Sequence, residues 1–287
     1  MDRCDALYVS PHLDDAVLSC PGRILEDVAA GRRVVVATLF SRGDETYDRR
    51  REEDRRALGL LGAEPLWLDL PDSPYRNPYY NSFRTIVLDE HHSDHPFVAE
   101  VASTIRSLWE RLRPGRVHLP LAAGTHIDHR LVHRAWTALP PDANVTFYED
   151  RPYVFLRGNL ETRLREIGSP AEEIPLHDFL ASLRRTRYVS SYLPPGPERF
   201  RAVLQLARRL RAPVAAEGPM LRQDLLCATS ARLETITAAV GCYASQIYDL
   251  FDTMDRFRDD TSDYTRHLSP GAAYAERAWG LLHRTPH

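Results

Sequence analysis

The strongest constraint on the fold lies in the first 150 residues, where apolar segments typical of buried strands alternate with helical periodicity. The expected strands are residues 6–10, 33–40, 65–70, 116–121 and 145–149. The expected helices are residues 15–30, 48–61, 97–112 and 129–139. Strands that alternate with helices in this way form βαβ units with parallel pairing. The sequence therefore predicts an α/β fold, with a Rossmann-like and mostly parallel sheet flanked by helices.

The second half of the chain is richer in arginine and in helical patterns, which cover residues 178–187, 197–211 and 231–254. No internal repeat or low-complexity linker divides the chain. We therefore expect a single domain over residues 1–287. Within it, residues 1–150 are expected to form the α/β core that carries the functional site, and residues 151–287 a more helical part that shapes substrate binding.

The overall composition excludes several classes of partner. Lys and Arg number 37 against 40 Asp and Glu, a net charge of −3, so no basic field attracts nucleic acid or anionic lipid. The apolar runs are too short to span a bilayer, and the N-terminus lacks the apolar stretch of a signal peptide. The four cysteines show no C-x-x-C spacing, which indicates reduced thiols. We expect a cytoplasmic protein with no nucleic-acid partner and no membrane insertion, and a homo-oligomer stays open.

Polar side chains follow the first expected strand directly. His12, Asp14 and Asp15 stand between the strand at 6–10 and the next helical pattern, at the edge where open α/β sheets build their sites. Carboxylates in such a half-buried place are costly unless something compensates them, and a metal ion is the simplest compensation. The alternative is an ordinary helix N-cap, in which an aspartate accepts hydrogen bonds from backbone N–H groups.

A second polar motif follows the strand at 116–121. His126, Asp128 and His129 stand where that strand gives way to a helix, and two such junctions in one parallel sheet can meet across its edge. Three protein ligands and an open position make a catalytic zinc site, which activates water and polarises a carbonyl group. Helix capping is again the alternative for the histidines. His133, one turn further on, could compete as a ligand, but its place deeper in the helix favours a structural role.

The two motifs resemble those of a known family. Pro11-His12-Leu13-Asp14-Asp15 is similar to the PHPDD motif, and His126-Ile127-Asp128-His129 to the HxDH motif, of the LmbE-like N-acetylglucosaminyl-phosphatidylinositol de-N-acetylases (PIG-L family). The resemblance continues through Arg51-x-Glu53-x-x-x-Ala57 with Leu61-Gly62, and through the segments 148–153, 243–246 and 274–277. Members of this family are zinc-dependent deacetylases of N-acetylated sugars and related metabolites.

The resemblance assigns roles to the motif residues. It implies three zinc ligands, His12, Asp15 and His129. It implies Asp14 as the general base, and His126 as the group that stabilises the oxyanion or protonates the leaving amine, with Asp128 orienting it. Other divalent transition metals suit the same nitrogen and oxygen ligands.

The sequence departs from the family pattern at two positions. Leu13 stands where many relatives have proline, and Ala16 where many have glutamate, so a contact usual in the family is in doubt. Nearby polar residues are the candidates for substrate binding: Arg42, Asp44, Arg51, Tyr148 and Asp150. For the charged ones the competing interpretation is an ordinary solvated surface. The histidine-rich run 91–95, which ends a long segment beginning at Pro71, is expected to be an exposed polar loop rather than a second metal site.

These features favour a zinc-dependent N-deacetylase. We expect it to hydrolyse the acetamide of a small metabolite that contains an N-acetylamino sugar, with antibiotic or other natural-product biosynthesis as the context. One alternative is a metal-dependent amidase acting on a non-sugar acyl amine or a thiol conjugate. A second is a catalytically silent α/β module that binds a sugar or a partner protein. A dinucleotide-binding role is disfavoured because no G-x-G-x-x-G follows the first strand.

Overall fold

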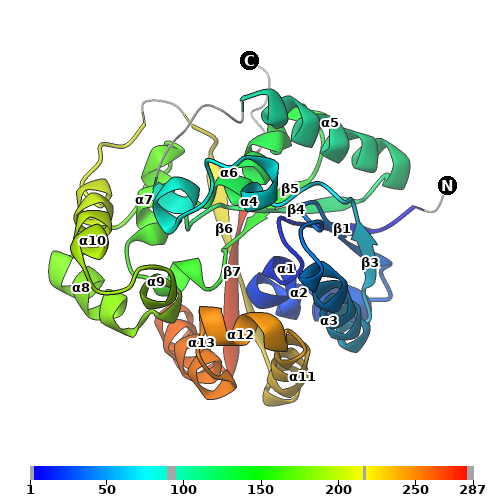
Figure 1. Ribbon diagram of the computed structural model, residues 1–287. Coiled ribbons are helices and arrows are strands. Elements are labelled where there is room, and N and C mark those ends of the chain that lie inside the picture. The colour runs from blue at the N-terminus through cyan, green and yellow to red at the C-terminus, as the bar shows by residue number, and fades with distance from the viewer. Residues whose placement is uncertain (1–2, 89–94, 216–217, 283–287) are drawn as a thin grey trace.

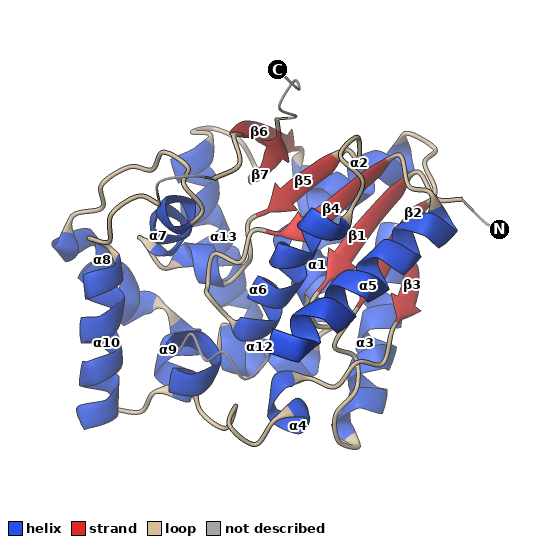
Figure 2. Ribbon diagram, turned by 90° about the horizontal axis from the view of Figure 1, so that it is seen from above, coloured by secondary structure: helices blue, strands red, loops and turns tan. Residues whose placement is uncertain are grey.

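The computed structural model describes residues 3–88, 95–215 and 218–282. Among these residues, seven strands form one sheet in the order β3-β2-β1-β4-β5-β7-β6 (Figures 1 and 2). The strands are β1 (Ala6–Ser10), β2 (Val34–Thr38), β3 (Glu64–Trp67), β4 (Arg116–Pro120), β5 (Val145–Tyr148), β6 (Leu221–Ala228) and β7 (Tyr274–Leu281). β1 to β5 pair in parallel, and β7 and β6 continue the sheet in antiparallel pairing.

Helices cover both faces of this sheet. One face carries α5 (His95–Leu112) and α6 (Ile127–Arg134), and the other carries α1 (Asp15–Ser19), α2 (Pro21–Ala29), α3 (Thr46–Leu61) and α11 (Ser230–Gly241). Alternate residues of a strand point to opposite faces, so Leu7 and Val9 of β1 enter one core and Ala6 and Tyr8 the other. Every residue of β1 and β2 is buried, as expected for parallel strands covered on both sides.

A group of helices beside the sheet forms a further hydrophobic core. It includes α8 (Leu176–Arg185), α9 (Arg187–Tyr192) and α10 (Pro197–Arg209), at the side of the molecule in Figure 1, with α7 (Asn159–Glu166) between them and the sheet. Phe83 and Val87 from the long segment after β3 pack into this core. That segment contains a short helix, α4 (Ser73–Arg76), and a π-helical turn, η1 (Arg84–Leu88), so its first part is ordered rather than an open loop.

The sequence-based expectations for the first 150 residues are largely confirmed. All five expected strands are present, and the expected segment 6–10 has the bounds of β1. The expected helix at 15–30 is two helices, because Pro21 begins α2 and cannot donate a backbone hydrogen bond to the turn before it. The expected helix at 129–139 starts earlier, at Ile127, and ends in the 3-10 turn η3 (Ala135–Ala138).

The second half differs more from its expectation. It contributes β6 and β7 to the sheet, whereas the sequence predicted mainly helices there. The helical pattern expected over 231–254 is interrupted, and α11 is followed by α12 (Ala244–Leu250) and then α13 (Met254–Leu268). Where the chain is described, no helix is long and apolar enough to cross a membrane.

Candidate metal centre

The site lies at the carboxyl ends of β1, β4 and β5, at the edge of the parallel part of the sheet. Ser10 ends β1 and shapes the turn that follows, because its hydroxyl donates to the carbonyl of His12 (2.6 Å) and accepts from the backbone N–H of Ala16 (3.0 Å). This turn presents His12 and Asp15 to the inside. His129 reaches the same point from the first turns of α6, so the two sequence motifs meet.

Three ligand atoms converge there. Asp15 Oδ2 lies 3.0 Å from His12 Nδ1 and 3.2 Å from His129 Nε2, and one ligand atom from each residue lies within 4.8 Å of the others. All three side chains are buried. Burial by itself opposes the charged carboxylate, yet the two histidines hold the pKa of Asp15 well below its ordinary value. For His129, burial lowers the pKa, but Asp15 and Asp150 outweigh it and raise the pKa to about 9.

His129 Nε2 is directed at the point where the three ligand atoms converge. This nitrogen is buried, and its contact with Asp15 Oδ2 at 3.2 Å lacks hydrogen-bond geometry, which is unusual for a buried polar atom. Two imidazole nitrogens and a carboxylate oxygen form a ligand set that suits Zn²⁺. The residues present therefore fit a divalent metal ion.

The other nitrogen of His129 has a fixed partner. Asp150 Oδ1 lies 2.6 Å from His129 Nδ1, and Asp150 Oδ2 accepts the backbone N–H of Ala123 at 3.0 Å. This contact fixes the ring with Nε2 toward Asp15, and metal-binding histidines are commonly held in this way by a carboxylate on their other nitrogen. The structure thus places Asp150 behind His129.

Two residues expected to contact substrate are therefore placed elsewhere. Asp150 is fully buried and holds His129, and Tyr148 is fully buried with its hydroxyl donating to the carbonyl of Val9 (2.9 Å). Tyr148 is the last residue of β5 and Asp150 follows that strand, and neither lines the cavity at the site.

Asp14 lies beside the convergence point without joining it. Its side chain makes no capping hydrogen bond to α1, so the N-cap alternative does not describe it. The guanidinium of Arg50 lies 3.5 Å from its carboxylate. Burial and then the neighbouring Asp15 raise the pKa of Asp14, while Arg50 opposes the rise. A carboxylate in this position lines the cavity and can hold a proton there.

His126 caps α6 and stays neutral. Its Nδ1 accepts the backbone N–H of Asp128 at 3.2 Å, and its ring meets that of His12 edge-on at a centroid distance of 5.0 Å. Burial and the nearby His12 lower the pKa of His126 to about 3. Because Nδ1 is an acceptor, the single proton of the neutral ring is on Nε2.

The carboxylate of Asp128 has a different role from the expected one. It accepts from Arg76 at 2.6 Å and lies 3.1 Å from His12 Nε2, and only the backbone of Asp128 contacts His126. Since α6 begins at Ile127, the Asp128 side chain turns inward toward α4. Asp128 therefore holds His12 by its second nitrogen, as Asp150 holds His129. His12, His126 and Asp128 also have ligand atoms close enough to form a second group that could hold a metal.

The sequence reasoning gave no specific role to three residues of the site. Asp72 Oδ1 lies 3.4 Å from His12 Nε2, Arg50 faces Asp14, and Arg76 pairs with Asp128. Asp72 could have been found, because it follows the third expected strand. The run Arg49-Arg50-Arg51 gives no indication of which arginine turns inward, because that depends on the exact rotation of α3 about its axis.

The charged loop residues predicted to bind substrate lie outside the cavity. Arg42 is exposed, and Asp44 is exposed and accepts from Thr46. Arg51 donates to the carbonyl of Ser41 and pairs with Asp69. His133 hydrogen-bonds from Nδ1 to the carbonyl of Pro120 (3.0 Å), in line with a structural role. Of the histidine-rich run, residues 91–94 lie outside the described part of the chain.

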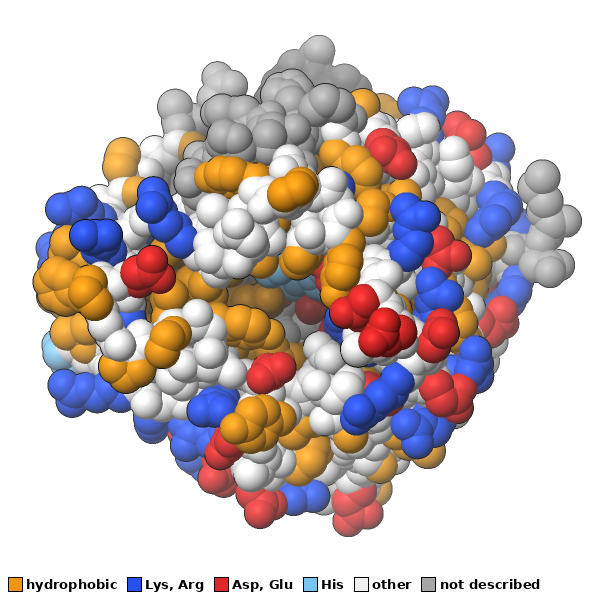
Figure 3. Space-filling model, viewed as in Figure 1, with side chains coloured by type: hydrophobic (Ala, Val, Ile, Leu, Met, Phe, Trp, Pro, Cys, Tyr) orange, Lys and Arg blue, Asp and Glu red, His pale blue; other side chains and the backbone are white. Residues whose placement is uncertain are grey.

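The cavity above the site has a volume of about 210 Å³. Its floor is polar, with His12, Asp14, Asp15 and His126. Its walls are largely apolar and aromatic: Phe83, Ile86, Val87, Tyr153, Tyr188, Tyr192 and Leu250. Figure 3 shows the hollow from outside, with histidine at its floor and hydrophobic side chains around it. The helices of the second half thus provide much of the wall.

Comparison with known proteins finds a family model that matches part of the chain. Residues 7–139 match the family model described as PIG-L, GlcNAc-PI de-N-acetylase. A 2'-N-acetylparomamine deacetylase of Streptomyces fradiae is 32% identical over 183 residues, which are 56% of this chain and 62% of that protein. A protein of the same name from Niallia circulans is 25% identical over 190 residues, covering 53% of this chain and 68% of that one. The chain thus spans somewhat under two thirds of the length of the first relative.

Solved structures share the fold over the whole chain. The zinc-inhibited form of teicoplanin deacetylase Orf2 has a TM-score of 0.70 at 22% identity, covering 99% of this chain and 100% of that one. The A40926 pseudoaglycone deacetylase Dbv21 has a TM-score of 0.67 at 20% identity, with complete coverage of both chains. At these identities the likeness establishes the fold alone.

Proposed function

We propose that the protein is a zinc-dependent N-deacetylase that releases acetate from an N-acetylated amino sugar, and the match of residues 7–139 to the PIG-L family model supports this. One observation carries this proposal: the buried convergence of His12 Nδ1, Asp15 Oδ2 and His129 Nε2 on the floor of a cavity. The buried His129 Nε2, which forms no well-aligned hydrogen bond with Asp15, supports it further.

The proposed ligands of the metal are His12, Asp15 and His129, with Asp128 and Asp150 orienting the two histidines. When bound, a zinc ion lowers the pKa of its water toward neutrality and polarises the carbonyl group of a substrate. The remaining steps depend on residues of the chain itself.

Asp14 is the proposed general base. Its carboxylate takes a proton from the water that attacks the acetamide carbon, and returns that proton to the amine nitrogen as the C–N bond breaks. The products are acetate and the free amine. Burial and Asp15 raise the pKa of Asp14, which helps it to accept the proton, and Arg50 at 3.5 Å keeps it from being protonated beforehand.

His126 is proposed to stabilise the oxyanion. Its proton is on Nε2, and a neutral ring with a pKa of about 3 is a poor proton acceptor but a good hydrogen-bond donor. Donors already in position for the developing negative charge contribute strongly in such reactions. This division leaves the amine to be protonated by Asp14.

The proposed substrate is a small metabolite that contains an N-acetylamino sugar. The named relatives act on 2'-N-acetylparomamine, by the words of their names. An amidase acting on a non-sugar acyl amine is the second candidate, because the apolar walls of the cavity do not by themselves require a sugar. A cytoplasmic location stays a prediction from the sequence.

The test is acetate release from a panel of N-acetylglucosamine glycosides and non-sugar acetamides, measured with zinc-loaded protein. We expect turnover of at least one sugar substrate. We expect Asp14→Asn to lose about a thousandfold or more in kcat while it keeps its metal. Release only from non-sugar acetamides would favour the amidase. No release from any substrate, or full activity in Asp14→Asn, would contradict the proposal.

A further inference from the structure

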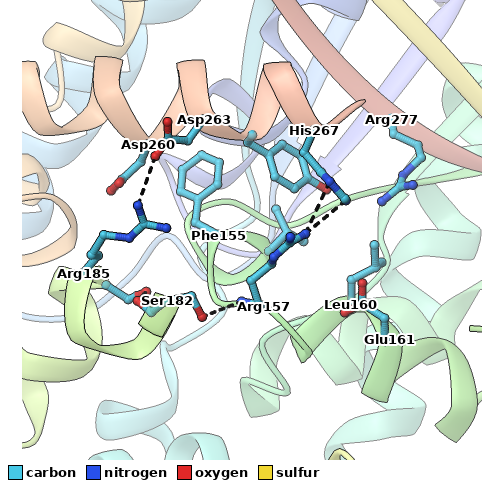
Figure 4. A pocket seen from close by; sticks show the side chains of 13 residues that line it. Phe155, Arg157, Leu160, Glu161, Ser182, Arg185, Asp260, Asp263, His267 and Arg277 are labelled. Carbon is cyan, nitrogen blue, oxygen red and sulfur yellow. Dashed lines mark hydrogen bonds and ion pairs between the residues drawn. The ribbon is translucent and has the colours of Figure 1, made fainter. Parts of the chain in front are cut away.

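A second cavity, of about 310 Å³, is lined in part by Val154 and Phe155 of the turn η4 (Tyr153–Phe155) (Figure 4). Tyr153 lines the catalytic cavity and meets the ring of His129 edge-on, whereas Phe155 lines the second cavity. The second cavity is bounded by residues of α7, α8, α13 and β7. Nothing in the proposed hydrolysis uses it.

The carboxylates that line this cavity are already engaged by groups outside its lining. Glu161 accepts the backbone N–H of Gly158 at 3.0 Å. Asp260 pairs with Arg256 at 3.2 Å, and Asp263 pairs with Arg266. Burial also raises the pKa of Glu161, and raises that of Asp260 to about 6. Burial therefore disfavours the charged form of both carboxyl groups.

Two of the arginines that line the cavity have guanidinium N–H groups that are available to a ligand. Among the described residues, Arg157 has no carboxylate within ion-pair distance, and its guanidinium lies 3.3 Å from the ring nitrogens of His267. Arg185 reaches Asp263 only at 3.5 Å, and that carboxylate also serves Arg266. Figure 4 shows Arg157 and Arg185 on either side of the Phe155 ring. Burial, then Arg157 and Arg277, lower the pKa of His267, as a positive local potential does.

The lining therefore combines an arginine that has no carboxylate partner among the described residues, Arg157, with an apolar surface. Val154, Phe155 and Leu160 provide that surface. We propose that this cavity binds a small organic anion, whose carboxylate or phosphate accepts hydrogen bonds from Arg157 and Arg185 and whose apolar part packs on Phe155. Arginine is well suited to planar, charge-assisted recognition of both anions, and the volume is within the range of small-molecule sites.

Calorimetry with three probes tests this on zinc-loaded protein. Benzoate and phenyl phosphate separate the two kinds of anion, and benzylamine has a similar ring with a positive charge. We expect one of the anions to bind with a Kd of about 1 mM or tighter, and benzylamine not to bind. Arg157→Gln should weaken binding about tenfold or more. Arg185→Gln should weaken it as well, and its side chain is 63% exposed, so that this variant is expected to fold normally.

Two control variants locate the binding. Arg106→Gln removes a distant surface arginine, paired with Glu110, and should leave the Kd unchanged. Arg50→Gln changes the catalytic cavity, and should also leave it unchanged. The proposal is wrong if neither anion binds, if benzylamine binds instead, or if Arg50→Gln weakens binding while Arg157→Gln does not. The assay does not depend on turnover, so its result is independent of the proposed hydrolysis.

Discussion

Replacing Asp150 by asparagine should weaken zinc binding, because Asp150 holds His129 through the ring nitrogen that faces away from the other proposed ligands. The Asp150 carboxylate has two acceptor oxygens, and both are used, one for His129 Nδ1 at 2.6 Å and one for the N–H of Ala123 at 3.0 Å. Asparagine keeps one acceptor and gains an NH₂ donor. If the NH₂ group faces His129, the ring proton moves to Nε2, the atom that should bind the metal. If it faces Ala123, a buried amide loses its acceptor, which costs about 1–3 kcal/mol.

The expected loss follows from this geometry. Removing the partner that orients a metal-binding histidine typically weakens metal affinity about 10- to 100-fold, or about 1.4–2.7 kcal/mol. Zinc affinity is measured by competition with a chromophoric chelator, on Asp150→Asn and on wild-type protein. A zinc affinity within twofold of wild type would refute the reasoning, because His129 would then not need Asp150.

A matched control separates this effect from general loss of stability. Asp54 is another buried carboxylate with two donors, Trp67 Nε1 and the Tyr243 hydroxyl, both at 2.8 Å. Asp54→Asn makes the same chemical change outside the candidate site. We expect it to leave zinc affinity unchanged, even if it lowers the free energy of unfolding.

Two further predictions concern His126 and His118. His126→Ala should lower kcat for acetate release about 100- to 1000-fold with zinc still bound, as expected for the loss of an oxyanion donor, and an unchanged kcat would exclude that role. His118 is buried against Tyr8 with neither ring nitrogen hydrogen-bonded to a described residue, and burial lowers its pKa to about 3. The unfolded chain takes up this proton below about pH 6.5, so the contribution of His118 to wild-type stability should be complete above that pH and fall by about 1.4 kcal/mol per pH unit below it. In urea unfolding, His118→Phe should therefore gain about 2 kcal/mol over wild type between pH 7.5 and pH 5, and an equal difference at both values would contradict the pKa argument.

Much of the fold near the site could be predicted because its signals are local. The run Ala6–Ser10 is uniformly apolar up to its end and is buried on both faces, so its place in a parallel sheet follows from the pattern. The meeting of His12 and His129 follows from topology, because β1 and β4 are neighbours and their carboxyl ends share one edge. Such features need only period and order along the chain.

Other features depend on tertiary structure and were missed. The strand β6 lies at the edge of the sheet. Three consecutive residues in it, Arg222, Gln223 and Asp224, are polar and exposed, so its sequence lacks the alternation of apolar and polar residues that predicts a strand. Asp128 turns to His12 rather than His126 because α6 starts at Ile127, and helix boundaries are hard to place from sequence. The choice of Arg50 over Arg51 depends on how α3 packs, which pairs Arg51 with Asp69 instead.

The most direct test of the account is acetate release from an N-acetylglucosamine glycoside as zinc is added back to metal-free protein. The account predicts no turnover without metal, and a rise that is complete at about one equivalent of zinc per chain. In His129→Ala the rise should be absent, because one of three converging ligands is gone. Full turnover by the metal-free protein would contradict the account.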